Sequence, residues 1–467
     1  MVAVSAGVIL ATIDASIVNV AFPTLTSELD TTFNTIQWVA LGYLLTIATL
    51  TLGMGRLGDV IGKKYLYVAG FAVFTAASVL CGLAPTVGWL IGFRVIQALG
   101  SVMILALGSA ILVEAFPPSE RGKALGWIGT AVSLGIITGP VIGGVLISAF
   151  SWRAIFLVNL PVGLVGTFLA SRFVPKTPPA EGQRFDLVGA FLMSVALFSL
   201  SLGLTLGQEQ GFTSPPILTA FVVSLVSGAA FVRFELKSDH PMIQLRLFRN
   251  PTLSVSVVSG FLAFLCLSAT FFLMPFYLEG VLGLEIGTVG LLLGAGPLMV
   301  GILSPISGTL SDRLGIRTLT LSGLLIMAIV YLGFQTLDTD TSIPHYLLLA
   351  IPLGAGIAIF QSPNNSAIMG AVPREYMGIG GGILTLTRLL GQISGIAVMG
   401  SIWAASVAAT LGGTLPEGGA SSADAAAQVA GLHTTFMIAA VVMFVAVGIG
   451  AWGLKKERQD SAVIATG

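Results

Sequence analysis

Gly135-Ile-Ile-Thr-Gly139-Pro140-Val-Ile-Gly143-Gly144 lies in an apolar stretch that has no charged residue between Lys123 and Arg153. Three of its glycines are spaced four residues apart, so they share one helix face and let another helix backbone come close. The proline cannot donate its backbone N–H and should bend the helix, which a membrane helix tolerates because neighbouring groups satisfy the freed carbonyl. The stretch predicts a close-packed membrane helix; ordinary packing in a helix bundle would explain the glycines alone equally well.

Composition supports a membrane protein. The chain has 467 residues, of which 55% are hydrophobic and only 9% are charged, whereas a soluble domain carries about 25% charged residues. The formal net charge is zero, so no basic surface indicates nucleic acid as a partner. The sequence contains no phosphate-binding loop of the G-x-x-x-x-G-K-[ST] type, and its histidines are not grouped as metal ligands. We therefore expect no cofactor, no bound metal and no enzymatic activity.

Hydropathy and loop signals predict fourteen membrane-spanning helices, each with about 20 apolar residues. The predicted spans are 3–25, 34–57, 63–84, 87–112, 122–149, 153–172, 186–207, 215–236, 252–279, 286–310, 316–336, 345–371, 378–408 and 432–454. The fold class that follows is an all-α integral membrane protein.

The distribution of positive charge tests this number of spans. When the loops are taken alternately, 18 of the 21 Lys and Arg residues fall in the set that includes the C-terminal tail. The opposite set holds only Arg153, and Arg94 and Arg388 lie inside spans. The positive-inside rule then places both termini on the cytoplasmic side. The expected location of the protein is the cell (inner) membrane. The opposite, outer set is mildly acidic: Glu28, Asp30, Glu209, Glu279, Glu285, Asp338, Asp340, Glu417 and Asp424.

A weak internal repeat indicates two homologous bundles. The segments Gly55–Lys64 and Gly308–Arg317 both read G-x-L-x-D-x-x-G-x-K/R, and both lie between two predicted spans. Internal symmetry of this kind is typical of transporters. We predict an N-terminal six-helix bundle (1–175), an inserted transmembrane hairpin of helices 7 and 8 (176–240), and a C-terminal six-helix bundle with a short cytoplasmic tail (241–467).

Charged residues within spans are costly and are therefore candidates for function. Asp14 lies about eleven residues into the first span, which is near mid-membrane at 1.5 Å per residue. A carboxyl group away from water favours its neutral form, so Asp14 is a candidate to load and release a proton. Arg94 keeps its proton and either tunes Asp14 or holds an anionic substrate group. A purely structural Asp14–Arg94 pair is the alternative, and the two roles can coexist.

Further polar residues are candidates to line a substrate cavity, although bridging between helices is the more common role of such residues. Arg388 stands in the thirteenth span and either faces the central cavity or binds backbone carbonyls. The uncharged candidates are Asn19, Gln97, Gln361, Asn364 and Asn365.

The segment after the second span suggests a cytoplasmic latch. Its glycines permit a tight turn, and its aspartate can cap a helix or pair with a neighbouring cation. Anchoring of topology by positive charge explains the same basic residues. The latch candidates are Gly55, Arg56, Asp59, Gly62, Lys63 and Lys64.

The chain resembles the fourteen-helix drug:proton antiporters of the major facilitator superfamily over essentially its whole length. Gly55–Lys64 is similar to the cytoplasmic loop motif of the superfamily, and Gly135–Gly144 matches its antiporter motif g-x-x-x-G-P-x-x-G-G. Ile13–Pro23 resembles the first-helix motif, and Trp152–Gly163 resembles the sixth-helix signature of the fourteen-helix branch. Arg94–Gly100 resembles R-x-x-Q-G-x-g, with alanine at position 98 where glycine is usual.

The resemblance implies a major-facilitator fold and export driven by proton influx, as in multidrug efflux and antibiotic resistance. It implies that Asp14 and Arg94 form the proton relay. It also implies that the antiporter motif makes an interface between the two bundles, through Gly135, Gly139, Pro140, Gly143 and Gly144. The expected partners are protons, the lipid bilayer and an amphipathic small molecule; a periplasmic adaptor is possible but not visible in the sequence.

Three functions are compatible with a chain of this kind or have to be weighed against it. The first is proton-coupled export of drug-like compounds, and the second is export or import of one metabolite such as a siderophore, a lipid-like molecule or a sugar. The third, a membrane enzyme or receptor, has no supporting nucleophile–base pair, metal cluster or appended domain. Because the predicted spans hold one carboxylate, Asp14, and two arginines, Arg94 and Arg388, we expect neutral or weakly acidic substrates in preference to dicationic ones.

Overall fold

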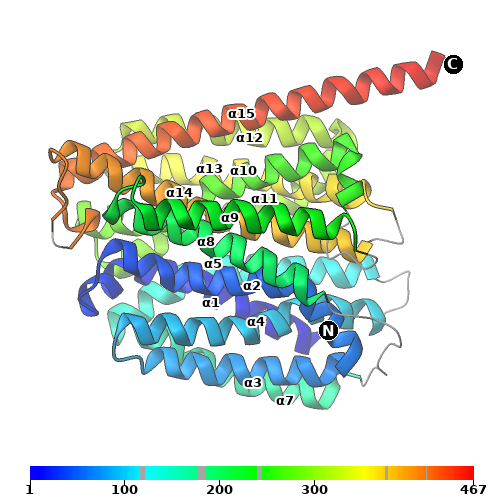
Figure 1. The fold of residues 1–467 in the computed structure, drawn as a ribbon, viewed down its shortest axis with the longest axis horizontal. Helices are drawn as coiled ribbons and strands as arrows, with labels where there is room; N and C mark the ends of the chain where they lie inside the picture. Colours follow the sequence, from blue (N-terminus) through cyan, green and yellow to red (C-terminus); the bar gives the residue numbers. More distant parts are fainter. Residues whose placement is uncertain (116–120, 176–185, 239–244, 374–376, 417, 467) are drawn as a thin grey trace. The chain divides into compact units, whose positions relative to one another are not determined.

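The structure is a computed structural model that describes residues 1–467 except 116–120, 176–185, 239–244, 374–376, 417 and 467. In the part of the chain that it describes, every regular element is helical, which confirms the all-α prediction (Figure 1). The chain divides into two compact units, and each is described by itself.

The first unit comprises Met1–Met242, Met274–Gly294 and Pro416–Ser422. Its helices are α1 (Val2–Glu28), α2 (Phe33–Ile61), α3 (Lys63–Gly82), α4 (Val87–Ala115), α5 (Arg121–Ala149), α6 (Ala154–Leu157), α7 (Asn159–Phe173), α8 (Leu187–Gln210) and α9 (Pro215–Glu235). It also holds the π-helical turn η2 (Phe276–Val281), the first turns of α11 (Ile286–Leu314) and the short turn η5 (Ala420–Ser422).

The second unit comprises Ile243–Leu273, Ala295–Leu415 and Ala423–Gly467. It contains η1 (Leu245–Arg249), α10 (Pro251–Pro275), the rest of α11, α12 (Ile316–Gly333), η3 (Phe334–Thr336), α13 (Ile343–Gly370), α14 (Met377–Thr410) and α15 (Ala425–Thr466). Leu253, Ile368, Val372 and Ile383 form a buried apolar cluster between α10, α13 and α14 in this unit. The three predicted domain ranges, 1–175, 176–240 and 241–467, remain a prediction.

The helices follow the predicted spans closely. Twelve helices in the described residues are long and apolar enough to cross a membrane. The two other predicted spans, 122–149 and 186–207, fall on α5 and α8, whose described apolar parts Thr138–Ala149 and Val188–Leu204 are shorter. The number fourteen therefore stays a prediction. Large apolar side chains such as Leu225 on α9, which is 74% exposed, suit a surface covered by lipid.

Two predicted spans differ from the observed helices. The last helix begins at Ala425 and not near 432, because the alanine run 425–427 has high helix propensity. The predicted span 153–172 is not one continuous helix, because it is divided at Val158 into α6 and α7. Pro161 follows this division and cannot donate a hydrogen bond to the carbonyl of Leu157.

The internal repeat is present in the structure of each unit. Gly62 ends α2 with φ of 106°, and Gly315 ends α11 with φ of 88°; both values lie in the region that favours glycine. The next helix pairs also correspond. A β-carbon on Gly70 of α3 would lie 3.1 Å from the carbonyl oxygen of Gly100 on α4, and one on Gly323 of α12 would lie 2.7 Å from that of Gly356 on α13. In both repeats, the helix that follows the glycine turn therefore packs closely against the next helix.

Candidate functional site

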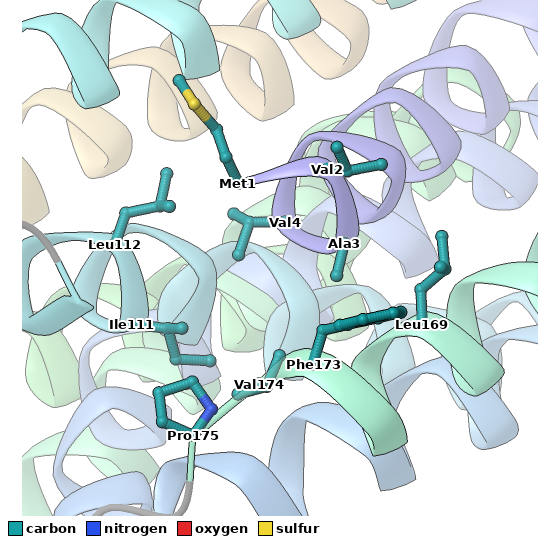
Figure 2. A pocket seen from close by; sticks show the side chains of 10 residues that line it. All are labelled: Met1, Val2, Ala3, Val4, Ile111, Leu112, Leu169, Phe173, Val174 and Pro175. Atoms are coloured by element: carbon teal, nitrogen blue, oxygen red, sulfur yellow. The ribbon is translucent and has the colours of Figure 1, made fainter.

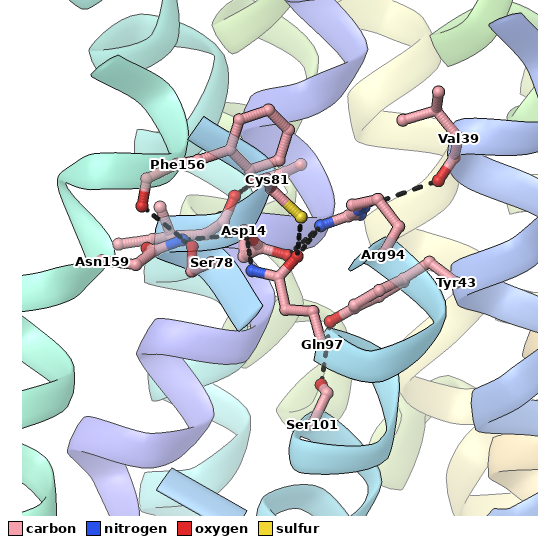
Figure 3. A network of polar contacts seen from close by, with 12 residues as sticks. Asp14, Val39, Tyr43, Ser78, Cys81, Arg94, Gln97, Ser101, Phe156 and Asn159 are labelled. Carbon is pink, nitrogen blue, oxygen red and sulfur yellow. Dashed lines mark hydrogen bonds and ion pairs between the residues drawn. The ribbon is translucent and has the colours of Figure 1, made fainter. Parts of the chain in front are cut away.

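The charged residues predicted in the first unit form a buried ion pair. Nη1 of Arg94 on α4 lies 2.5 Å from Oδ2 of Asp14 on α1 (Figure 3). Asp14 is 0% exposed and Arg94 is 1% exposed. A desolvated charge is costly unless a partner compensates it, so each residue depends on the other.

Neutral amides complete the environment of the Asp14 carboxylate. Its Oδ1 accepts hydrogen bonds from Nε2 of Gln97 at 2.8 Å and from Nδ2 of Asn159 at 2.9 Å. The same Gln97 accepts from Nη1 of Arg94 at 2.7 Å. Gln97 therefore bridges the two charged residues, and α1, α4 and α7 meet at one carboxylate (Figure 3).

The guanidinium of Arg94 is also held by α2. It lies over the ring of Tyr43 at 4.0 Å from the centroid, and its Nε donates to the carbonyl of Val39 at 3.5 Å. The Tyr43 hydroxyl donates to Oγ of Ser101 at 2.8 Å. A cation over an aromatic face gains electrostatic energy, more so away from water. Arg94 therefore joins α2 to the network around Asp14.

Asn159 lies within the sixth-helix signature Trp152–Gly163, but it was not predicted as a site residue. It stands at the first position of α7, directly after the division at Val158, and its Nδ2 also donates to Oγ of Ser78 at 3.0 Å. Ser78 in turn donates to the carbonyl of Phe156 at 2.9 Å. An amide within an apolar span was the available signal, but it does not reveal its partner.

Replacing Asn159 with leucine should lower the melting temperature of the protein in detergent more than replacing Ser78 with alanine. The first change removes a donor to a buried carboxylate, an interaction of about 1.5–3 kcal/mol, while the second removes neutral hydrogen bonds of about 1 kcal/mol. Thermal unfolding of both variants measures the difference. Equal melting temperatures would show that Asn159 does not stabilise Asp14.

The glycine face of α5 packs against α1, the helix that carries Asp14. A β-carbon on Gly135 would lie 3.1 Å from the nitrogen of Ile13, and one on Gly139 would lie 3.0 Å from that of Ile17. Gly143 continues the face, because a β-carbon there would lie 3.2 Å from the carbonyl oxygen of Ile17. The Ser16 hydroxyl donates to the carbonyl of Gly135 at 3.1 Å. The close approach predicted from the glycines is confirmed.

The other side of the motif faces the first turns of α11. A β-carbon on Gly144 would lie 2.7 Å from the carbonyl oxygen of Ile286 and 3.1 Å from Cα of Gly290. The carbonyl oxygen of Pro140 approaches Gly290 closely as well. The interpretation that the whole stretch faces the second bundle is therefore wrong for Gly135, Gly139 and Gly143, which face α1. Gly144 is one residue further along the helix than Gly143, so it points in another direction and contacts another helix.

The second-unit candidates have separate environments. Asn364 is buried, and its Nδ2 donates to the carbonyl of Ser256 at 3.1 Å, so it bridges α13 and α10. The neighbouring Gln361 and Asn365 are half-buried, and so is Arg388 on α14. Asn19, on α1 of the first unit, is also half-buried. The roles of these residues in a substrate cavity remain predictions.

The predicted cytoplasmic latch lies mostly on helices. Gly55 to Ile61 belong to α2, and only Gly62 separates that helix from α3, so the segment is not a loop. The side chains of Arg56 and Asp59 lie outside the described residues, as does the environment of Gly55. Lys63 is buried and Lys64 is half-buried at the start of α3. The latch itself stays a prediction.

A cavity of about 380 Å³ lies at the start of α1 (Figure 2). Apolar residues line it: Met1–Val4, Ile111, Leu112, Leu169 and Phe173–Pro175. Asp14 follows Val4 by ten residues, or about 15 Å along a helix. The cavity is therefore not part of the polar network. In the described residues, no three His, Cys, Asp or Glu side chains gather as metal ligands would.

A buried carboxylate in an all-helical chain with an internal repeat is typical of a secondary transporter, and comparison with known proteins identifies the family. The profile of the Major Facilitator Superfamily matches residues 4–396. The chain belongs to this superfamily; it is a multi-pass membrane transporter and not an enzyme.

Curated relatives cover most of the chain. The riboflavin transporter RibZ of Clostridioides difficile (strain 630) is 34% identical over 411 residues, which are 87% of this chain and 88% of RibZ. The multidrug resistance protein Stp of Mycobacterium tuberculosis (strain CDC 1551 / Oshkosh) is 32% identical over 414 residues, which are 88% of this chain and 76% of Stp.

A solved structure shares the fold. It is a bacterial homolog of the human lysosomal transporter Spinster, in an inward-facing and unoccupied conformation. The TM-score is 0.70 with 17% sequence identity, and the match covers 98% of this chain and 97% of that one. At this identity, the likeness extends to the fold and not to the substrate.

Proposed function

We propose that the protein is a proton-coupled antiporter that exports amphipathic drug-like compounds by alternating access. The observation that carries the proposal is the Asp14 carboxylate, which is completely buried in an apolar helix and paired with Arg94. An intramembrane carboxylate of this kind is typical of proton relays in transporters. The multidrug resistance protein Stp, at 32% identity, supports the direction of transport.

Asp14 would bind and release the proton, and Arg94 would control this exchange by moving toward or away from it. Gln97 and Asn159 hold the carboxylate in place, so proton binding at Asp14 affects contacts with α4 and α7 directly. The movement of these helices would link proton binding to substrate release. The glycine face of α5 would keep α1 in position during that movement.

The substrates are proposed to be neutral or weakly acidic. Arg94 neutralises Asp14, so this network has no surplus negative charge for a cationic drug. Arg388 and the amides Gln361 and Asn365, all half-buried, are the proposed substrate contacts of the second unit, and Asn19 is the proposed contact of the first.

A second candidate function is transport of one metabolite. It is favoured by RibZ, a riboflavin transporter that is 34% identical to this chain over 411 residues. Riboflavin is therefore the first metabolite to test, ahead of siderophores, lipid-like molecules and sugars.

Expression in a host without its own efflux pumps should raise resistance to several unrelated neutral or weakly acidic amphiphiles. Because the proposed export uses proton influx, an uncoupler should remove the protection. Growth inhibition and dye efflux, each with and without the uncoupler, measure this. Protection by the Asp14→Asn variant equal to that of the wild type would contradict proton coupling, and movement of riboflavin alone would favour the metabolite carrier.

A further inference from the structure

A second carboxylate, Glu279, lies within a membrane span. The sequence counted it among the outer acidic residues, at the end of the predicted span 252–279, and the structure places it in the last turn of the span Pro251–Val281. This turn is η2, a π-helical segment that continues α10. Single π-helical turns often occur at functional sites. Glu279 is half-buried, and the three residues before it, Phe276 to Leu278, are buried.

The carboxylate has one weak contact. Its Oε1 accepts from the Thr24 hydroxyl of α1 at 3.5 Å, which is the long limit for a hydrogen bond. Its Oε2 is buried and has no hydrogen-bond partner among the residues that the structure describes. An ionised carboxylate in this position would lack compensation, whereas a protonated one would carry no charge away from water.

The charged groups of the surrounding elements do not supply a cation. On α1, Asp14 lies ten residues before Thr24, or about 15 Å along the helix, and Glu28 is exposed. After η2, Glu285 is exposed and has the same sign. The start of α2 contacts η2 through the rings of Phe33 and Phe276, 5.2 Å apart, and α2 carries no charged residue before Arg56.

We propose that Glu279 is a second proton-binding site, whose protonation stabilises the contact between η2 and Thr24 at the predicted outer end of α1. When the proton leaves Oε2 for the outer water, the ionised carboxylate gains solvation by separating from α1. When a proton returns, the neutral carboxyl group keeps the hydrogen bond from Thr24. Only the role of this contact in a transport cycle depends on the proposed function; the site itself depends on the geometry.

In an exporter driven by proton influx, this arrangement has a direct consequence. Binding of an outer proton at Glu279 would favour the packed arrangement of η2 and α1, so that proton arrival and movement at the outer end are linked. Asp14 would remain the carboxylate that exchanges its proton in the middle of α1. Glu279 would determine how readily the outer step occurs as the outer pH changes.

The test measures the distance between α1 and the segment after η2 without any transport. Spin labels at Ser27→Cys and Leu282→Cys, in protein reconstituted into lipid nanodiscs, report close and separated populations by pulsed electron spin resonance. For the wild-type background, we expect the ratio of close to separated molecules to fall as pH rises, by up to about tenfold per pH unit, the limit for one linked proton. The Glu279→Gln variant should give a constant ratio.

Matched variants decide the origin of the effect. Glu285→Gln removes an exposed carboxylate nearby and should titrate like the wild type. Glu279→Asp should retain a pH dependence. A wild-type ratio that does not change with pH would overturn the proposal. So would a Glu279→Gln variant that titrates normally. If the distances titrate as expected but no uncoupler-sensitive export is found, the proposed function fails and the proton site remains.

Discussion

Replacing Asp14 with asparagine should abolish uncoupler-sensitive export and lower the melting temperature of the protein. The change removes the group that binds the proton, so export can no longer be driven by proton influx. It also leaves Arg94 buried without the carboxylate whose Oδ2 lies 2.5 Å from its Nη1 in the ion pair. Removal of one partner from a buried ion pair costs about 3–5 kcal/mol. Dye efflux from everted membrane vesicles and thermal unfolding in detergent measure the two effects.

A double variant separates loss of the proton carrier from loss of structure. In Asp14→Asn with Arg94→Gln, neither charge remains, and an uncharged pair can be as stable as the ion pair it replaces. We expect the double variant to regain most of the melting temperature of the wild type and still to lack proton-driven export. Export by either variant with unchanged proton coupling would rule out Asp14 as the carrier.

Replacing Gly139 with alanine should have the second-largest effect, a loss of transport without loss of the protein from the membrane. In an isolated helix, alanine is more favourable than glycine by about 1 kcal/mol. Here its β-carbon would lie 2.9 Å from Cβ of Ser16 and 3.0 Å from the nitrogen of Ile17. The Ile17 nitrogen is a backbone atom and the Ser16 β-carbon is fixed to the backbone, so neither can give way unless α1 moves, and Asp14 is two residues from Ser16. Efflux per unit of membrane-inserted protein measures the effect.

Gly92 provides the matched control. It also lies inside a helix, α4, but a β-carbon there meets nothing within 4 Å. We expect Gly92→Ala to transport like the wild type at equal amounts of protein in the membrane. Normal transport by Gly139→Ala as well would mean that the glycine face serves only for ordinary packing.

The positions of the spans were largely predictable because apolar runs and loop charges are strong signals. The Asp14–Arg94 pair was predictable for the same reason, since a charge inside an apolar run must find a partner. Asn159 was not, because a neutral amide in such a run is common, and Pro161 alone does not specify that the helix divides at Val158. Long-range partners depend on how helices are arranged, and periodicity within one helix does not determine this arrangement.

The glycines illustrate the same limit. Their spacing predicted a close helix contact, which the structure confirms, but the helix that Gly139 contacts is α1 and not the one expected. Glu279 was counted with the outer acidic residues although the predicted span 252–279 ends on it; the π-helical turn that carries it is not visible as a periodic pattern.

The contact between α1 and α5 also limits how the carboxylate can be uncovered. Thr12, Ser16 and Val20 of α1 each lie against a successive glycine of α5, so the two helices interlock along about two turns. Sliding along this contact would have to occur in steps of a full turn, about 5.4 Å. Exposure of Asp14 by axial displacement against α5 is thus disfavoured. We therefore expect water to reach Asp14 when α4 or α7 tilts away, with α1 and α5 moving together as one rigid pair.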